Sequence, residues 1–218
     1  MLNLYAFFVL CGLFLIYSFI GWIIEVIFSF IVEHKFINRG FLVGPLVPIW
    51  GIAAVLITLI LRPDDSLFNL IISSAFIGTF LEYIVNYLME KIFKARWWDY
   101  SNMPFNINGR VCLAFSCLFG LCGVLVVKVF NPLFFKMFLI MNNSVFCILV
   151  SILMLLVAID FCISLNIVQK LKLSADSLRK DYTEEISKKV RAVLMNKSLG
   201  FKHLLKAFPN VKFEFKKK

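Results

Sequence analysis

The sequence predicts an all-α protein: a polytopic bundle of about five transmembrane helices followed by a basic amphipathic cytoplasmic C-terminal helix. Three observations support this fold class. Hydrophobic residues make up 61% of the 218 residues, whereas soluble domains average about 45–50% apolar residues. The apolar residues fall into long runs, each close to the roughly 20 residues that cross a bilayer. Charged residues, at 17% of the chain, gather between these runs and near the C-terminus.

Five apolar runs qualify as membrane spans. Helices are expected because strands would leave backbone groups unpaired in lipid. The first run lacks the basic stretch and small-residue cleavage site of a signal peptide, so we expect it to be a retained helix. The predicted spans are residues 4–32, 43–61, 67–89, 111–130 and 143–168.

The Lys and Arg residues of the connections set the expected orientation. The connections 33–42 and 90–110 and the C-terminal tail carry most of the positive charge, whereas the connection 62–66 holds one Arg and two Asp. This asymmetry predicts a cell-membrane protein with its N-terminus outside and its C-terminus in the cytoplasm. Five spans also require the two termini to lie on opposite sides of the membrane.

Two lysines do not fit this asymmetry, because Lys128 and Lys136 fall on the outer side. They flank or lie in the segment NPLFFKMFLIMNN, which follows the fourth predicted span. That segment is a candidate for an interfacial or re-entrant helix.

The predicted organisation is a transmembrane bundle, residues 1–168, and a cytoplasmic tail, residues 169–218. The tail from Lys170 onward holds 14 of the 23 basic residues. Because it directly follows an apolar run, we expect it to meet anionic inner-leaflet lipids rather than nucleic acid. Apolar residues at helical spacing predict an amphipathic helix over 174–196, serving either as a membrane anchor or as a partner-docking helix. The helix breakers expected after it are Gly200 and Pro209.

Three acids lie within the predicted spans, each in the cytoplasmic third of its helix: Glu25, Glu82 and Asp160. Ionisable residues in a membrane usually face a bundle interior or a water-filled cavity. Their expected partners are Arg39 and Arg110, and we expect Arg110 to pair with Glu82.

The residues around these acids predict a polar cavity. Glu82, Asn86 and Glu90 recur every four residues and therefore share one helix face. Before the second span, Asn38 and Arg39 precede a stretch rich in Gly and Pro. Such irregular backbone is tolerated at membrane depth where it lines protein or water.

The connection ARWWDYSNMPFNINGR, residues 95–110, runs into the fourth span. Its two tryptophans, Trp97 and Trp98, suit the interfacial aromatic belt or ligand stacking. Asn106 and Asn108 are expected to fold the connection through side-chain-to-backbone bonds, with Gly109 permitting a turn. Arg110 is either a positive-inside anchor or a fork for a carboxylate or phosphate. Together with Asp99, these residues predict an ordered polar cap over the acids.

Four stretches resemble one family: GWIIEVIF, NRGFLVGPLVPIWG, FLEYIVNYLMEKIF and WWDYSNMPFNINGRVCLAFSCLFG. The sequence resembles the bacterial membrane proteins described as putative ABC-transporter type IV, or putative ABC transporter permease, over roughly residues 5–165. The resemblance implies transport, a separate ATPase subunit and a homo-oligomer or partner subunit. The substrate-binding residues predicted from the residues and the resemblance together are Glu25, Asn38, Arg39, Glu82, Asn86, Trp98, Asp99, Tyr100, Asn106, Asn108 and Arg110.

Three functions remain open from the sequence: a transporter or permease-like subunit, a membrane enzyme acting on lipid head groups at the inner leaflet, and a non-catalytic scaffold. Clustered carboxylates beside Arg and Asn suit acid–base chemistry. However, the two histidines lie in a connection, at His34, and in the tail, at His203. No P-loop motif occurs, and neither a cofactor nor a metal is predicted.

Overall fold

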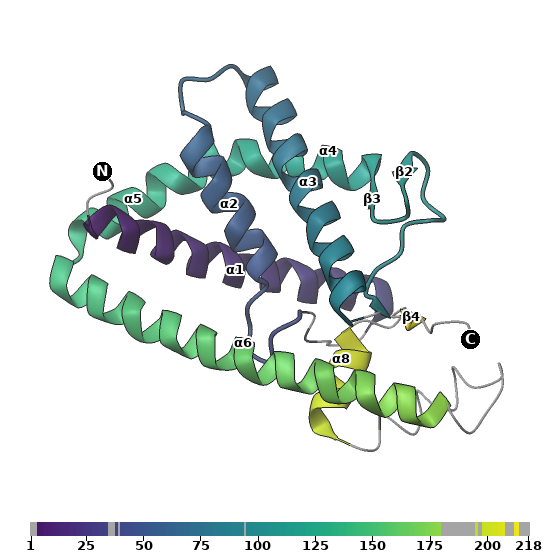
Figure 1. Cartoon of the computed structure of the whole chain (residues 1–218). Coiled ribbons are helices and arrows are strands. Elements are labelled where there is room, and N and C mark those ends of the chain that lie inside the picture. Colours follow the sequence, from purple (N-terminus) through teal and green to yellow (C-terminus); the bar gives the residue numbers. More distant parts are fainter. Residues whose placement is uncertain are drawn as a thin grey trace.

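The computed structural model describes residues 4–34, 38, 40–93, 95–179, 195, 198–207 and 212–213. The described chain is mostly helical (Figure 1), which confirms the predicted all-α membrane bundle. The elements in chain order are α1 (Leu4–Glu33), α2 (Pro48–Ile60), α3 (Leu67–Phe93), β1 (Ala95–Arg96), β2 (Asn106–Ile107), β3 (Val111–Cys112), α4 (Leu113–Leu125), η1 (Val126–Phe130), α5 (Asn131–Ile140), α6 (Asn143–Arg179), α8 (Leu199–Ala207) and β4 (Lys212–Phe213).

Four helical stretches in the described residues are long and apolar enough to cross a membrane. α2 is a shorter apolar helix of 13 residues. α1 and α6 run in the same direction and contact each other, α2 packs against α1, and α3 packs against α4 (Figure 1). The four long stretches are Leu4–Ile31, Leu67–Phe93, Leu113–Ile140 and Asn143–Leu171.

The second predicted span is therefore only partly helical. α2 begins at Pro48, and the preceding Val47 has extended backbone, as expected for a residue before proline. At about 1.5 Å per residue, 13 residues cover roughly 20 Å of the roughly 30 Å hydrocarbon core. Residues 40–47, the inserted segment, approach the bundle without helical structure, and Leu42 within them is fully buried.

The fourth span is longer than predicted, because α4, η1 and α5 form one continuous helical stretch. η1 is a π-helical turn in which the backbone N–H of Asn131 donates to the carbonyl of Val126, five residues back. Pro132 follows at the start of α5, where it has no N–H to donate. The expectation of a separate interfacial or re-entrant helix is therefore wrong: the segment continues the span.

Lys128 has a local role that explains its position on the predicted outer side. It lies in η1, and its ammonium group donates to the carbonyl oxygens of Pro63 and Asp65 in the turn between α2 and α3. The lysine thus ties this turn to the fourth span, which is a structural reason for a positive charge there.

Small residues allow α3 and α4 to approach closely, as in many membrane helix pairs. A Cβ atom added at Gly123 of α4 would lie 2.0 Å from the hydroxyl oxygen of Ser74 in α3. One at Gly78 of α3 would meet the Phe119 ring at 2.8 Å. The crossing of these two helices therefore depends on residues that lack a larger side chain.

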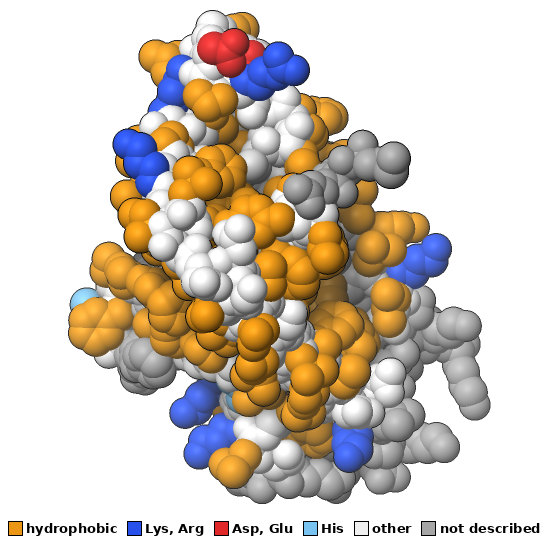
Figure 2. All heavy atoms as spheres, turned by 90° about the vertical axis from the view of Figure 1, so that its left-hand side faces the viewer, with side chains coloured by type: hydrophobic (Ala, Val, Ile, Leu, Met, Phe, Trp, Pro, Cys, Tyr) orange, Lys and Arg blue, Asp and Glu red, His pale blue; other side chains and the backbone are white. Residues whose placement is uncertain are grey.

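The exposed surface is dominated by hydrophobic side chains. Figure 2 shows one face on which such side chains cover most of the area and acidic side chains appear only at the top. Leu139 and Ile140 are 78% and 86% exposed. Apolar surface on this scale is expected where lipid is the solvent.

Part of the tail docks onto the bundle. α8 buries Phe201, Leu204 and Leu205 in a hydrophobic cluster with Phe93, Trp97, Val168 and Leu171. Gly200 lies inside α8, so the expectation that it breaks a helix is wrong. β4 of the tail pairs antiparallel with β1. α6 continues without a break through the predicted domain boundary to Arg179, and the remainder of the predicted 174–196 helix lies outside the described residues, apart from Met195.

Candidate functional site

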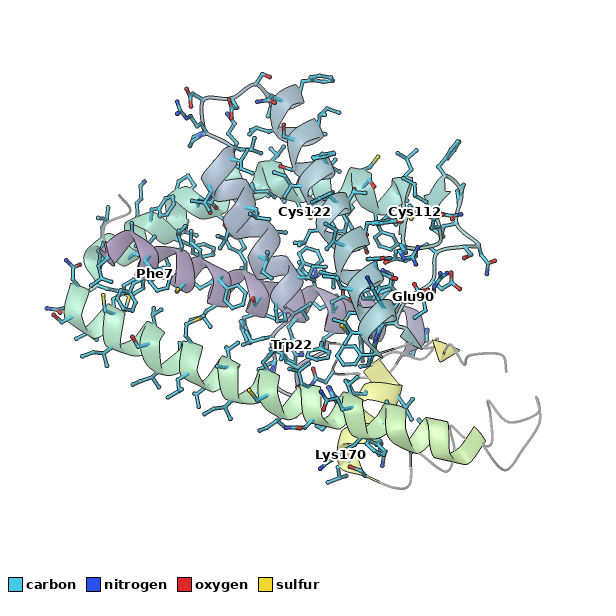
Figure 3. The ribbon with its side chains drawn as sticks, in the orientation of Figure 1. Phe7, Trp22, Glu90, Cys112, Cys122 and Lys170 are labelled. Atoms are coloured by element: carbon cyan, nitrogen blue, oxygen red, sulfur yellow. The ribbon has the colours of Figure 1, made fainter. Side chains whose placement is uncertain are left out.

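The C-terminal half of α3 presents one polar face. Glu82, Asn86 and Glu90 are 7%, 1% and 8% exposed, which confirms that residues four apart share a face and shows that it points inward. Residues 95–110, called the cap here, cover this face. Figure 3 shows Glu90 near the end of α3, beside the cap. Burial of this kind requires polar partners, which the cap supplies.

The cap folds through the side-chain-to-backbone bonds predicted for Asn106, whereas the Asn108 amide instead reaches the Tyr83 hydroxyl of α3. The Asn106 amide donates to the Met103 carbonyl at 2.8 Å and accepts from the Gly109 N–H at 3.0 Å. Gly109 has φ +66°, and a Cβ there would meet the side chains of Ser101 and Asp99. The resulting turn joins β2 and β3, which pair antiparallel.

Hydrogen bonds connect the cap to α3. The Tyr100 hydroxyl donates to Glu82 Oε1 at 3.1 Å, and the Asn86 amide donates to the Trp98 carbonyl at 3.1 Å. The Trp98 indole in turn donates to the Arg110 carbonyl at 3.1 Å. Both the backbone carbonyl and the indole N–H of Trp98 are therefore bonded within the protein.

A second set of contacts lies beside the α3 tyrosines. The Asn108 amide donates to the Tyr83 hydroxyl at 3.0 Å. The Arg110 guanidinium lies 5.5 Å and 5.6 Å from the ring centroids of Tyr83 and Tyr87, within the range of a cation–π interaction. Tyr83 and Tyr87 of α3 therefore both contact the cap.

The partner of Arg110 is Glu90, not Glu82 as predicted. Arg110 Nη2 lies 2.8 Å from Glu90 Oε2, and Arg96 Nη2 lies 3.4 Å from Glu90 Oε1. The physical reason is the position of each residue along the helix axis. Arg110 precedes α4 at the level where α3 ends, so Glu90 is closer to it along the helix than Glu82. Arg96 also lies 3.6 Å from Asp99, so this carboxylate belongs to the same charged network.

Glu82 instead shares its environment with Tyr100 and Glu25. Burial raises the pKa of the Tyr100 hydroxyl above its ordinary value, and the nearby charges of Glu82 and Glu25 raise it further. Tyr100 is therefore a neutral hydrogen-bond donor. Glu25 is half-buried and close enough to act on the same group.

Asp160 has a different role from the predicted pairing with an arginine. Its carboxylate accepts from the backbone N–H groups of Val43 at 3.0 Å and Gly44 at 2.8 Å. It thereby holds the inserted segment against α6. Asn38 also serves this segment, since it accepts from the Trp22 indole at 2.5 Å and donates to the Val43 carbonyl at 2.9 Å. Arg39 lies outside the described residues.

Three buried atoms of this site have no hydrogen-bond partner among the described residues: Glu82 Oε2, Asn86 Oδ1 and Arg110 Nε. Glu82 and Asn86 are each more than nine-tenths buried. An unpaired buried polar group costs about 1–3 kcal/mol, more when charged. These atoms therefore need an explanation.

A second polar cluster, which sequence reasoning missed, lies elsewhere in the bundle. The Tyr17 hydroxyl donates to Asn131 Oδ1 at 2.7 Å, and the Asn131 amide donates to Thr58 at 2.9 Å. The sequence feature that could have indicated this cluster is Asn131, a polar residue that precedes Pro132 within an apolar run. In the described part of the chain, no group of three or more His, Cys, Asp or Glu side chains could hold a metal ion.

Long apolar helices and a buried polar face under an ordered cap define a multi-pass membrane protein. A family model described as "Putative ABC-transporter type IV" matches residues 12–165. The chain belongs to this family, which confirms the resemblance predicted from the sequence. No curated protein and no solved structure matches the chain significantly.

Proposed function

We propose that the chain is the membrane subunit of a transporter and that its substrate binds on the polar face of α3 under the cap. The observation that carries this proposal is the set of unpartnered buried atoms on Glu82, Asn86 and Arg110. Family membership supports transport as the activity. The substrate would supply the missing hydrogen bonds.

The second polar cluster provides an internal comparison. There, both ends of the Asn131 amide are bonded, to Tyr17 and to Thr58. A buried polar network whose members are bonded in this way rigidifies the packing of helices. The Asn86 amide, in contrast, uses its nitrogen and leaves its oxygen unpaired. An incomplete network at a 1% exposed residue favours a site that is completed by a ligand.

The cap is the element that would admit the substrate. Its hydrogen bonds to α3 come from Tyr100, Trp98 and Asn108. Arg96 and Arg110 add bonds to Glu90. None of these bonds belongs to the backbone of a helix, so each can break without unfolding one. We place the cap, with the C-terminus, on the cytoplasmic side of the cell membrane and the N-terminus outside. The distribution of Lys and Arg supports this orientation.

A lipid-modifying enzyme finds less support. His34 lies at the end of α1 and is exposed, while His203 of α8 contacts the Leu42 carbonyl. In the described part of the chain, Glu82 and Asn86 bond to Tyr100 and to the Trp98 carbonyl, and not to a histidine. A base near these residues would have to be Glu82 itself, and no observation favours this chemistry over binding.

Partners are proposed from the surfaces that remain exposed. Met103, Phe105 and Ile107 form an apolar tip of the cap, with Phe105 80% exposed, and this tip suits a separate ATPase subunit. Exposed Lys202 and Lys206, one turn apart on α8, suit anionic lipid head groups. Asn143–Leu171 of α6 has the smallest buried share among the four long stretches, and it is the proposed contact for lipid or for a second copy.

A ligand screen tests the proposed site. Purified protein in detergent is heated with a library of small polar metabolites, and compounds that raise the melting temperature are compared between the wild type and Glu82→Gln. Exposed Asp64 in the turn between α2 and α3 provides the charge-matched control, Asp64→Asn. We expect hits that stabilise the wild type and the control but not Glu82→Gln, and whose uptake by cells requires the wild-type chain. Compounds that stabilise Glu82→Gln as much as the wild type would place the binding site elsewhere.

A further inference from the structure

The polarity of the unpartnered atoms limits the chemistry of the ligand. Glu82 Oε2, in its ionised form, and Asn86 Oδ1 can only accept hydrogen bonds. The two residues are one helical turn apart on the same face of α3, a spacing that puts Cβ atoms about 5–6 Å apart. A ligand that satisfies both atoms must donate hydrogen bonds.

Both arginines of the cap already contact a carboxylate, and Arg110 Nε is the one cap-arginine nitrogen that is buried and unpartnered among the described residues. Arg110 and Arg96 both contact the Glu90 carboxylate, at 2.8 Å and 3.4 Å. A carboxylate or phosphate ligand would therefore compete with Glu90 for Nη2 of both guanidinium groups. An anionic ligand would also have to lie beside Glu82 while its own charge repelled that carboxylate.

Two other occupants fit less well. Metal ions that prefer oxygen require about six or more ligands, and no cluster of three or more suitable side chains occurs in the described residues. A quaternary ammonium carries the right charge but has no N–H donor, so it would leave both acceptor atoms unpaired. A protonated primary amine has the right charge and three donors on one nitrogen.

We propose that the polar face of α3 binds a protonated primary amine, which donates hydrogen bonds to Glu82 Oε2 and Asn86 Oδ1. The bond to Glu82 is charge-assisted and is the stronger of the two. Tyr100 keeps Glu82 Oε1 occupied at 3.1 Å, which leaves Oε2 for the ligand. This inference rests on the proposed function and adds the chemical class of its substrate.

Binding of simple ions to the full-length protein tests the class. Melting temperatures are measured with methylammonium, ethylammonium and butylammonium chloride at pH 7.5 and constant ionic strength. Tetramethylammonium chloride matches the charge without donors, and sodium acetate supplies the opposite charge. We expect stabilisation by at least one primary amine and none by tetramethylammonium or acetate. This comparison uses only the wild type, so it does not depend on the folding of a variant.

Variants then assign the site. Isothermal calorimetry with the best amine is expected to show affinity reduced about 10- to 100-fold in Glu82→Gln, as follows from losing a charged hydrogen bond. A smaller reduction is expected in Asn86→Leu and none in Asp64→Asn. Gel filtration confirms that each variant is folded and monodisperse.

The outcomes separate the two proposals. Glu82-dependent stabilisation by acetate or tetramethylammonium, without any by the primary amines, overturns the amine and keeps the proposed site. Amine binding that is equal in the wild type and Glu82→Gln overturns this inference, because the amine then binds elsewhere. If no compound of any charge class stabilises the protein through Glu82, both the inference and the proposed site are wrong.

Discussion

Arg110 connects several groups of the site. Its guanidinium contacts Glu90 and lies over the rings of Tyr83 and Tyr87, and its carbonyl accepts from Trp98. The side chains of Arg110 and Glu90 are 14% and 10% exposed, so the pair is largely shielded from solvent. Screening by water is weak there, and removing one partner leaves the other charge with poor solvation.

A double-mutant cycle tests this pair. We expect Glu90→Gln and Arg110→Gln each to reduce the free energy of unfolding by about 2–3 kcal/mol. The double variant should lose less than the sum, with a coupling of about 1 kcal/mol or more. Unfolding in mixed SDS and detergent micelles measures these values. Arg110→Gln combined with Asp64→Asn is the control and should be additive. Additivity in the Glu90 cycle would show that the contact contributes nothing.

The sequence predicted which residues gather at the site better than which of them form an ion pair. Glu82, Asn86 and Glu90 were predicted on one face because a helix repeats every 3.6 residues, and Asn106 and Gly109 were predicted to build a turn because of their backbone preferences. The partner of Arg110 was missed because hydropathy places a residue along a helix only to within a turn or two. Glu82 and Glu90 differ by just such a distance.

At the scale of elements, helix contacts depend on positions where a side chain is nearly absent. α3 and α4 approach each other at Ser74 and Gly123, and an added Cβ at Gly123 would lie 2.1 Å from Ser74 Cβ. Because that atom is next to the backbone, it cannot rotate away. The helices themselves would have to separate.

Gly123→Ala is therefore expected to destabilise the protein by about 1–3 kcal/mol through overpacking, although alanine favours helix formation more than glycine. Ser74→Gly in the same chain should recover part of the loss by removing the opposing atoms. Leu121→Ala, at an exposed position of α4, is the control and should change stability little. The free energy of unfolding in mixed micelles is measured for the wild type and the three variants. A Gly123→Ala variant as stable as the wild type would refute the close approach.

α8 is held at the bundle by a histidine that burial keeps neutral. His203 Nε2 lies 3.1 Å from the Leu42 carbonyl, so neutral His203 donates to the inserted segment. Burial lowers the pKa of His203 from its ordinary value of 6.5, although the Leu42 carbonyl and Asp160 act in the opposite direction. The folded state therefore binds this proton less readily than the unfolded state.

This difference predicts a pH dependence. The contribution of neutral His203 is fully present above about pH 6.5 and is lost as the pH falls below it, because the unfolded state gains the proton first. We expect the wild type to lose more stability between pH 7.5 and pH 5.5 than His203→Gln, whose amide can donate but does not titrate. Melting temperatures at both pH values measure the difference. Equal losses in the two proteins would remove His203 as the titrating group.

At the scale of the molecule, length and hydropathy predicted the long spans, since a run of about 20 apolar residues has one stable form in lipid. The same reasoning missed three features. The π-helical turn at 126–130 has no apolar periodicity of its own. The docking of α8 depends on Phe201, Leu204 and Leu205. These three apolar residues beside Gly200 are too few to predict an amphipathic helix from their spacing. The short α2 depends on Pro48, whose effect on the preceding residues competes with their hydropathy.

The proposed orientation predicts which connections are reached from outside. In a cysteine-free background, a Cys at position 65, in the turn between α2 and α3, should react with a membrane-impermeant maleimide on intact cells. A Cys at the exposed position 102 of the cap should react only after the membrane is permeabilised. The opposite pattern would invert the topology and place the cap outside.

The central claim is that the buried polar face of α3 is a site that solutes reach, and not a closed structural network. The test is the rate at which a small water-soluble thiol reagent modifies Asn86→Cys in purified protein whose six native, unpaired cysteines are replaced. Leu70→Cys is the matched control, because Leu70 is also on α3 and fully buried, but in the hydrophobic core. We predict that the cysteine at position 86 reacts much faster than the one at position 70, because opening of the cap admits water and solutes. Equal, negligible modification at both positions would contradict the account and make the polar face a scaffold.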